Sequence, residues 1–174
     1  MIAMPPFNLQ DALERAARRF PEVSGARKAR RSRADRGRSR LPEPVVALLD
    51  EALSGMDRPR FPDLQAAVSR LCEAQGIPRP SKATLYHYLA IAPLPSSMRR
   101  DLPPAVRNAL HNLDDESRVP ARQVVFAAFN YGNVEAISFA SGLPWLALYQ
   151  ADRVRGWRPK SHALLRAVMK GRGI

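Results

Sequence analysis

A run of arginine and lysine near the start of the chain sets the first limit on how it can fold. Residues 27–40 read RKARRSRADRGRSR, with eight basic side chains and one acid, Asp35. Removing so many hydrated cations from water together costs several kcal/mol each, so this run cannot belong to a hydrophobic core. It predicts a solvated basic arm that attracts polyanions. The basic residues of the arm are Arg27, Lys28, Arg30, Arg31, Arg33, Arg36, Arg38 and Arg40.

The overall charge indicates the class of partner. The chain has 28 basic and 16 acidic residues, a formal net charge of +12 and a sequence pI of about 11.1, which favours a nucleic-acid partner. The alternative is a basic protein from a genome that uses arginine heavily. A hydrophobic content of 45% excludes a wholly disordered chain, and 174 residues suffice for one domain or two small helical modules.

Cysteine usage and hydropathy favour a cytoplasmic protein. Cys72 is the single cysteine, so the sequence predicts neither an intramolecular disulfide nor a thiolate metal cage. No stretch approaches the roughly 18 apolar residues of a membrane span. The first twenty residues lack the basic-then-apolar layout of a secretory signal. We therefore expect no membrane association.

Helical patterns and breakers predict an all-α fold with two small helical modules, at least one of them a helix-turn-helix, joined by a Pro-rich linker. The N-terminal segment, residues 1–25, carries a short amphipathic helix over 8–20 with Asn8 as its cap. Such a short helix is marginal alone, so we expect it to fold against a partner or the rest of the chain. The remaining segments are the basic arm (26–43), a DNA-binding module (44–92), a Pro/Ser linker (93–103) and a C-terminal helical module (104–174).

The middle module contains three predicted helices. The first carries apolar residues at i, i+3, i+4 and i+7 and ends at Ser54-Gly55; the second starts after Pro62, with Asp63 as its cap, and ends at Gly76. Ser81 is a good N-cap for the third. The apolar positions of the first two helices are Val45, Leu48, Leu49, Ala52, Leu53, Leu64, Ala67, Val68, Leu71 and Cys72. In the third, Leu85, Tyr88 and Leu89 fall on the inner face, whereas Lys82, Ala83, Tyr86 and His87 point outward.

A helix, a turn and a capped helix with polar residues at its exposed start form the arrangement that places side chains against base edges. The free N–H groups of the third helix also favour an anion at its N-terminus. Ser81, Lys82 and Thr84 add hydroxyl and ammonium groups there, and Arg79 lies in the preceding turn. Two alternatives stay open for Tyr86: contact with a base or phosphate, or packing over the turn.

The segment VSRLCEAQGIPRPSKATLYHYL, residues 68–89, resembles the DNA-end-binding helix-turn-helix of Mu-type and related integrase-family transposases. Its PSKATLYHYL portion is also similar to the recognition helix of serine resolvases and invertases. The resemblance covers residues 68–89 and implies that Ser81, Lys82, Thr84, Tyr86 and His87 face DNA. It does not imply transposition, because the chain has no room for a catalytic domain with a carboxylate triad.

The C-terminal module is predicted to contain helices over 105–113, 119–131, 134–141 and 145–155, and a last helix that Ser161 caps and that runs through Lys170. The segment 136–157 has the layout of a second helix-turn-helix, which would bring Tyr149 and Gln150 to DNA, although Ser141 and the Pro144-Trp145-Leu146 start depart from that pattern. The alternative is a protein-interaction domain whose core contains Phe126, Phe129, Phe139 and Trp145. The tail cations able to follow a phosphate backbone are Arg153, Arg155, Arg158, Lys160, Arg166, Lys170 and Arg172.

The sequence contains no pattern that is typical of a catalytic site or a metal site. His87, His111 and His162 lie far apart, and none has a second ligand at i+3 or i+4. Asp114-Asp115-Glu116 has no accompanying nucleophile or base and is interpreted as a solvated turn and an acidic helix start between two helices. No phosphate-binding loop, G-x-S-x-G motif or Gly-rich dinucleotide turn is present. We therefore predict no metal, no cofactor and no enzymatic activity.

These patterns together predict sequence-specific binding of double-stranded DNA by a transcriptional repressor or mobile-element regulator. A homodimer is expected, because one such module reads few base pairs. The main alternative is an antitoxin-type protein that neutralises a partner enzyme and uses DNA binding for autoregulation; a toxin or a recombinase is therefore a possible protein partner. A third class, an RNA-associated factor, lacks the expected aromatic platform or sheet-based module.

Overall fold

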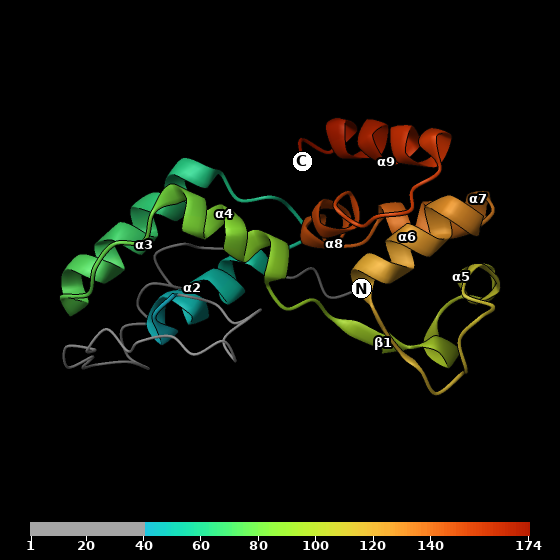
Figure 1. The fold of residues 1–174 in the computed structure, drawn as a ribbon, viewed down its shortest axis with the longest axis horizontal. Helices are drawn as coiled ribbons and strands as arrows, with labels where there is room; N and C mark the ends of the chain where they lie inside the picture. The colour runs from blue at the N-terminus through green and yellow to red at the C-terminus, as the bar shows by residue number, and fades with distance from the viewer. Residues whose placement is uncertain (1–40) are drawn as a thin grey trace. The chain divides into compact units, whose positions relative to one another are not determined.

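The computed structural model describes residues 41–174, which form two compact units (Figure 1). We use the name unit 1 for residues 41–55 and 59–92, the described part of the first unit, and unit 2 for residues 56–58 and 93–174. The described residues are mostly helical, with one small two-stranded sheet, so the prediction of an all-α chain is confirmed at this level. The predicted helix over 8–20 and the arm residues 26–40 lie outside the described residues.

Unit 1 is built from three helices, α2 (Glu43–Leu53), α3 (Phe61–Gln75) and α4 (Lys82–Ile91). The apolar positions predicted for the first two helices are all buried, which confirms their amphipathic patterns. Gly76 ends α3 with φ of 63°, a left-handed conformation that glycine adopts without steric cost. Six residues, 76–81, connect α3 to α4.

The start of α3 differs from the prediction. The helix begins at Phe61 rather than after Pro62, and Arg60, not Asp63, is its N-cap residue. Pro62 lies within the first turn, where its missing N–H costs nothing because that group has no partner inside the helix. Asp63 therefore lies inside the first turn, and its negative charge there is favourable at the positive end of the helix dipole.

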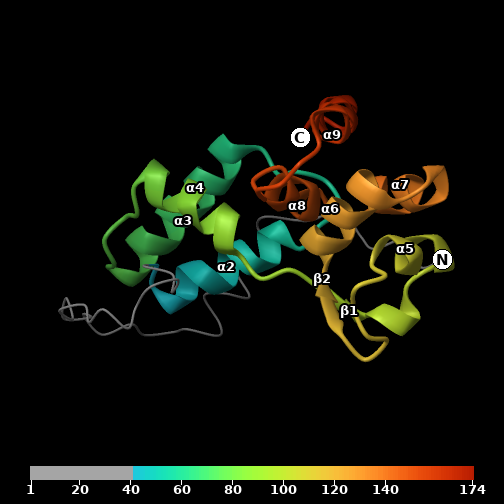
Figure 2. The same cartoon turned by 45° about the vertical axis from the view of Figure 1, so that its right-hand side comes forward.

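Unit 2 begins with a short sheet and continues as a helical bundle (Figure 2). The antiparallel strands β1 (Ser96–Met98) and β2 (Arg118–Pro120) place Ser97 opposite Val119. Between them lie the 3-10 helix η2 (Arg99–Asp101) and α5 (Pro104–Ala109). The remaining helices are α6 (Ala121–Tyr131), α7 (Val134–Ser141), α8 (Trp145–Ala151) and α9 (Pro159–Gly171).

The predicted linker 93–103 is where prediction and structure differ most. Residues in this range form β1 and η2, and β1 pairs with a strand more than twenty residues later in the chain. The Pro95 carbonyl also accepts a hydrogen bond from the Ala121 backbone N–H, at 3.0 Å. The local composition correctly indicated a break in the helical pattern. It could not show that residues 96–98 form a strand, because the strand with which they pair, residues 118–120, is distant in sequence. Residues 93–103 thus belong to unit 2.

Several helix ends in unit 2 also differ from their predictions. Helix α5 ends at Ala109 rather than Leu113, and α8 ends at Ala151 rather than Arg155. Val119 and Pro120 lie in β2, before α6 begins. Arg158, not Ser161, is the N-cap residue of α9. By contrast, the predicted helix over 134–141 is confirmed: the Asn133 side chain accepts a hydrogen bond from the Ala136 N–H at 3.0 Å.

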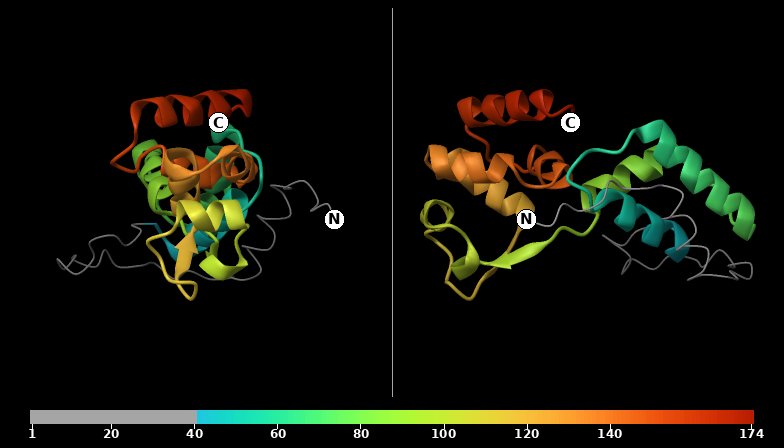
Figure 3. Two further views of the ribbon diagram at one scale, coloured as in Figure 1. Left: turned by 90° about the vertical axis from the view of Figure 1, so that its right-hand side faces the viewer. Right: turned by 180° about the vertical axis from the view of Figure 1, so that it is seen from behind.

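Helix α6 forms the centre of unit 2 and packs against α5, α7, α8 and α9 (Figure 3). All seven residues of α8 are buried, with Trp145 only 1% exposed. The tight connection from α6 to α7 requires Gly132, because a Cβ there would lie 2.5 Å from the Ala128 carbonyl oxygen and 2.6 Å from the Ala136 Cβ. Unit 2 is therefore a helical bundle in which α8 is an interior element.

The aromatic core proposed from the sequence is confirmed in part. Trp145 and Phe129 are buried, and Phe126 is half-buried. Phe139, however, is 38% exposed on α7, so its assignment to the core is wrong. Helix periodicity identified α7 as apolar, but it could not show which side of this short helix faces α6.

Candidate nucleic-acid interface

The N-terminus of α4 is capped as predicted. The Ser81 Oγ accepts a hydrogen bond from the Thr84 backbone N–H at 3.1 Å and lies 2.9 Å from the Thr84 Oγ1. The two hydroxyl groups share one hydrogen bond, so one of their two hydroxyl hydrogens is left for another acceptor. Ser81 is exposed and Thr84 half-exposed, which makes this donor accessible from solvent.

The two faces of α4 separate as the sequence predicted. Leu85, Tyr88 and Leu89 are buried, whereas Lys82, Ala83, Tyr86 and His87 are exposed. We call Ser81, Lys82, Thr84, Tyr86 and His87 the α4 edge. The inner face is fixed to α2 by the Tyr88 hydroxyl, which donates a hydrogen bond to the Asp50 carboxylate. Burial, together with this hydrogen bond and the negative charge of Asp50, raises the pKa of Tyr88 and keeps the phenol a neutral donor.

An aromatic pair lies beside the α4 edge. The rings of Phe61, at the start of α3, and Tyr86 are stacked, with centroids 4.2 Å apart and an angle of 4° between their planes. The Lys82 Nζ lies 5.7 Å from the Phe61 centroid and 5.9 Å from the Tyr86 centroid. Tyr86 is still 36% exposed, so it packs over a neighbour and also faces solvent. Sequence reasoning missed Phe61, because its partner is more than twenty residues away.

Arg79 has a partner that the sequence did not reveal. Its guanidinium pairs with the Glu73 carboxylate on α3, and both side chains are more than half exposed. An exposed pair of this kind is worth about 0–1 kcal/mol. Arg79 can therefore exchange Glu73 for another anion at small cost, but it adds no net positive charge to the surface.

The described residues of unit 1 are together not basic. It carries four basic side chains, Arg60, Arg70, Arg79 and Lys82. Against them stand five carboxylates, those of Glu43, Asp50, Glu51, Asp63 and Glu73. The α4 edge is thus a polar surface with one exposed ammonium group, and the excess charge of the chain lies elsewhere.

The predicted cations of the tail fall into two groups. Arg153 lies 3.6 Å from the Tyr149 ring centroid and donates to the Tyr149 carbonyl at 2.9 Å; Arg158 donates to the Asn130 carbonyl at 2.9 Å and lies 4.7 Å from the Tyr131 ring centroid. These two guanidinium groups hold the local fold. The side chains of Arg155 and Lys160 are exposed and have no hydrogen-bonded or ion-paired partner within residues 41–174.

The remaining tail cations show the same division. Arg172 donates to the carbonyl oxygens of Ser141 and Leu143, both at 2.7 Å, and to that of Met56 at 3.0 Å. Arg166 donates to Asp152 at 3.1 Å. Lys170 is exposed at the end of α9. Most arginines of the tail therefore act as structural donors as well as carrying charge.

A network of side-chain contacts that the sequence did not predict fixes the connection between α8 and α9. The Trp157 indole N–H donates to the Ala151 carbonyl at 2.9 Å, and its ring stacks on His162 with centroids 5.3 Å apart. His162 in turn lies 2.7 Å from the Asp152 carboxylate. Burial would raise the pKa of Asp152, but the hydrogen bonds and positive charge of Arg166 and His162 outweigh it and hold this pKa below its ordinary value. Arg155 and Lys160 thus flank an anchored tryptophan.

Tyr149 and Gln150 do not lie where a DNA contact requires them. They are 8% and 4% exposed, respectively, and their helix, α8, is buried along its length. The prediction that these two side chains face DNA is therefore wrong for the structure described. Residues 136–157 have the local sequence pattern of a second helix-turn-helix. In the structure, however, α8 packs against α6 and α9 and is part of the core.

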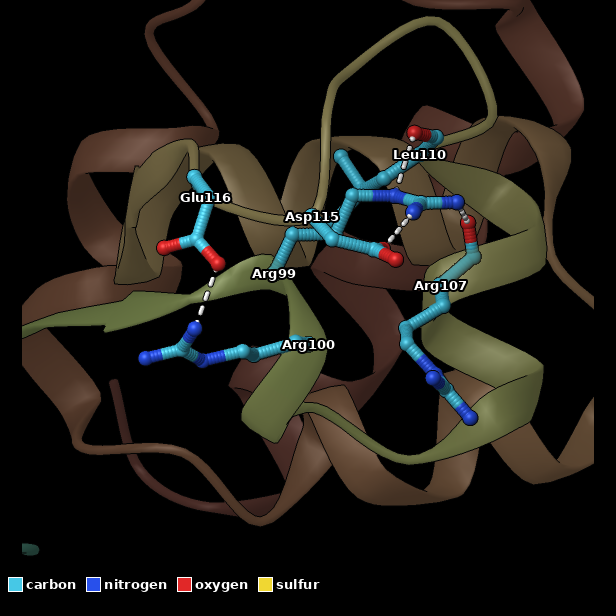
Figure 4. Close-up of polar contacts among 6 residues, drawn as sticks. All are labelled: Arg99, Arg100, Arg107, Leu110, Asp115 and Glu116. Atoms are coloured by element: carbon cyan, nitrogen blue, oxygen red, sulfur yellow. Dashed lines mark hydrogen bonds and ion pairs between the residues drawn. The ribbon is translucent and has the colours of Figure 1, made fainter.

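The acidic cluster of residues 114–116 lies in a turn, as predicted, but strand β2 and not a helix follows it (Figure 4). Asp115 pairs with Arg99, and Glu116 pairs with Arg100. Arg99 also donates to the carbonyl oxygens of Leu110, at 3.0 Å, and Arg107, at 3.1 Å. The two carboxylates thereby neutralise two arginines of unit 2 and connect η2 to the turn that precedes β2.

Residues 41–174 contain no group of three or more His, Cys, Asp or Glu side chains that could hold a metal ion. Within the same range, no helix combines the length and the apolar character that crossing a membrane requires. The free thiol of Cys72 is buried in α3, and this burial raises its pKa. The chain matches no family model, and comparison with curated proteins and with solved structures likewise gives no match.

Proposed function

We propose that this protein binds double-stranded DNA in a sequence-selective manner, with the α4 edge entering the major groove in the manner of a helix-turn-helix. The observation that carries the proposal is the division of α4 into two faces. Its inner face is buried and bonded to α2 through Tyr88 and Asp50, whereas its outer edge is exposed and polar. A rigid helix with such an edge has the form required for direct readout of bases.

The side chains of the α4 edge suit both parts of DNA recognition. The ammonium group of Lys82 is a donor for the O6 and N7 atoms of guanine, and the methyl group of Thr84 suits the thymine methyl group. The spare hydroxyl hydrogen of Ser81 and Thr84 suits a phosphate oxygen at the helix N-terminus. His87 lies one turn further along the same exposed side.

Affinity would come chiefly from outside unit 1. The basic arm, residues 26–40, carries eight cations, and Arg155 and Lys160 in unit 2 are exposed without a carboxylate partner in the described chain. Phosphate contacts supply much of the free energy of DNA binding but carry no sequence information directly. In this proposal the arm and unit 2 hold the duplex while α4 selects the sequence. A homodimer would double the number of base pairs read.

The cellular role that fits this activity is that of a transcriptional repressor or mobile-element regulator. A second candidate, an antitoxin-type protein that binds a partner enzyme, is favoured by apolar side chains on the surface of α7. Val134 is 82% exposed and Phe139 is 38% exposed, a pattern suited to a protein partner. DNA binding would serve autoregulation in this case, so the two candidates share the same α4 edge. A neighbouring gene for a nuclease would favour the antitoxin.

The proposal is tested by selecting bound fragments from randomised duplex DNA and then measuring Kd on selected and random sequences. Lys82→Ala and Thr84→Ala are each expected to weaken binding to the selected sequence by about 5- to 100-fold, the range for loss of one base contact. Binding to random DNA should fall much less. Arg70→Ala is the matched control, because it removes one exposed charge from α3 and leaves the α4 edge intact. Equal losses on both kinds of DNA would contradict direct readout by α4.

A further inference from the structure

We infer that Phe61, a residue of α3, is a positioning residue that sets sequence selectivity by holding Lys82 in one orientation on the α4 edge. This inference rests on the proposed function and adds to it a residue that need not touch DNA. It starts from Lys82, the only lysine among the described residues of unit 1, and from the aromatic pair that lies beside its ammonium group.

The ammonium group of Lys82 lies beside a pair of stacked rings. Phe61 and Tyr86 are parallel within 4° and 4.2 Å apart, and the Lys82 Nζ is at nearly equal distances, 5.7 and 5.9 Å, from their centroids. A cation almost equidistant from two stacked, parallel rings can lie above the face of at most one of them, so the pair offers Lys82 at most one cation–π contact, within the roughly 6 Å range of that attraction. Since Lys82 and Tyr86 are four residues apart on one helix, they already share a face. Phe61 adds a support from a different helix.

A lysine needs such support to act as a directed donor. Its four-carbon side chain has many rotamers, and its ammonium group is a point charge without preferred geometry. Lys82 forms no salt bridge with a carboxylate of the described chain. The aromatic pair is therefore the feature that restricts this side chain. A donor held in one orientation discriminates between base edges better than a mobile one, because it cannot turn to reach an acceptor at another position; it also loses less conformational freedom on binding.

The position of Phe61 argues against a purely structural role. Its side chain is only half-buried, whereas the core side chains of α3, such as Leu64 and Leu71, are each 2% exposed. The ring also stacks on Tyr86, which is 36% exposed, so the pair forms at the surface rather than inside unit 1. A residue placed there for stability alone would be expected to turn its ring toward the core.

The experiment compares Phe61→Leu with Phe61→Tyr in the full chain, with Kd measured on the selected sequence and on random duplex. Phe61→Leu removes the stacked ring and is expected to lower the ratio of selected to random affinity by about fivefold, typical of one exposed cation–π contact. Phe61→Tyr retains the ring and should keep the wild-type ratio. Thermal melting of each variant verifies that the fold is intact.

A double-mutant cycle with Lys82→Ala separates positioning from other effects. If Phe61 acts through Lys82, then Phe61→Leu changes the ratio in wild type and leaves it unchanged in the Lys82→Ala background. Additive losses, or an unchanged ratio in Phe61→Leu alone while Lys82→Ala loses selectivity, would overturn the inference and leave the proposed function intact. A wild-type protein that prefers no sequence would overturn the proposed function itself.

Discussion

Units 1 and 2 differ sharply in how they use charge. Unit 1 has four basic residues and five carboxylates, whereas unit 2 has thirteen basic residues and seven carboxylates. Yet the exposed polar helix edge that suits base recognition belongs to unit 1. The formal net charge of +12 therefore does not locate the recognition surface. In the function we propose, the surfaces that attract DNA and the surface that reads it are separate.

The division within unit 2 shows that charge counts also overstate the number of available cations. Arg99 and Arg100 pair with Asp115 and Glu116, and Arg172 is occupied by three carbonyl oxygens. Arg155 and Lys160, by contrast, are exposed without such partners in residues 41–174. A guanidinium that donates to several backbone carbonyl oxygens stabilises the fold, because each such hydrogen bond contributes about 0.5–1.5 kcal/mol.

Deletion of residues 26–40 should give the largest effect on DNA binding. The segment carries eight cations, and each phosphate contact contributes about 0.9 to the slope of log K against log salt concentration. We expect the slope to fall by about 3 to 7 and affinity to fall by more than about tenfold near 0.1 M salt, while the preference for the selected sequence persists. Fluorescence anisotropy at several salt concentrations measures both quantities. An unchanged slope would show that the arm does not contact DNA.

Neutralising the exposed tail cations should give a smaller effect of the same kind. The double variant Arg155→Gln, Lys160→Gln is expected to lower the salt slope by about 1 to 2 and to leave sequence preference unchanged. Arg100→Gln is the matched control for Arg155→Gln, because it removes an exposed arginine that is already paired with Glu116. If both single variants changed the slope equally, general charge rather than position would explain binding by unit 2.

Acid sensitivity of unit 2 should be the smallest effect. The pKa of Asp152 lies below its ordinary value of 3.8 in the folded chain, so its carboxylate contributes stability that is present above pH 3.8 and is lost as pH falls through the folded pKa. Asp152→Asn is therefore expected to lower stability at pH 7 by about 1 kcal/mol or less, given partial exposure. The difference in stability between Asp152→Asn and wild type should vanish as the pH falls below the pKa of Asp152 in the folded chain. Urea unfolding followed by Trp fluorescence measures it.

The Asp152 prediction has its own control. Asp114→Asn removes an exposed carboxylate that forms no ion pair within the described chain. It should leave stability nearly constant across the same pH range. A loss at pH 7 that equals that of Asp152→Asn would assign the effect to net charge instead of the network with Arg166 and His162.

Local patterns predicted the elements that depend on neighbouring residues. The buried faces of α2, α3 and α4 follow directly from apolar spacing, and the caps Ser81 and Asn133 follow from short polar side chains ahead of those faces. The same reasoning failed where a distant segment decides the outcome. Residues 96–98 become a strand only because residues 118–120 pair with them. The burial of α8 likewise depends on α6 and α9.

The α4 edge could thus be predicted, but not its support. Helical periodicity placed Lys82 and Tyr86 on one exposed face, whereas the stack with Phe61 depends on how α3 meets α4. The assignment of Tyr149 and Gln150 to DNA failed for the corresponding reason, since a sequence window does not show which helices surround it.

The sequence alone determined the helical character, the amphipathic faces and the serine-capped exposed edge, because these depend on contacts within about one or two helical turns. It also determined the charge of the chain, which is a matter of composition. Only the tertiary structure decided which arginines are occupied by carbonyl and carboxylate groups, which helix is interior and which aromatic ring supports Lys82. Those outcomes depend on contacts between residues far apart in sequence, and such contacts are set by packing rather than by local pattern.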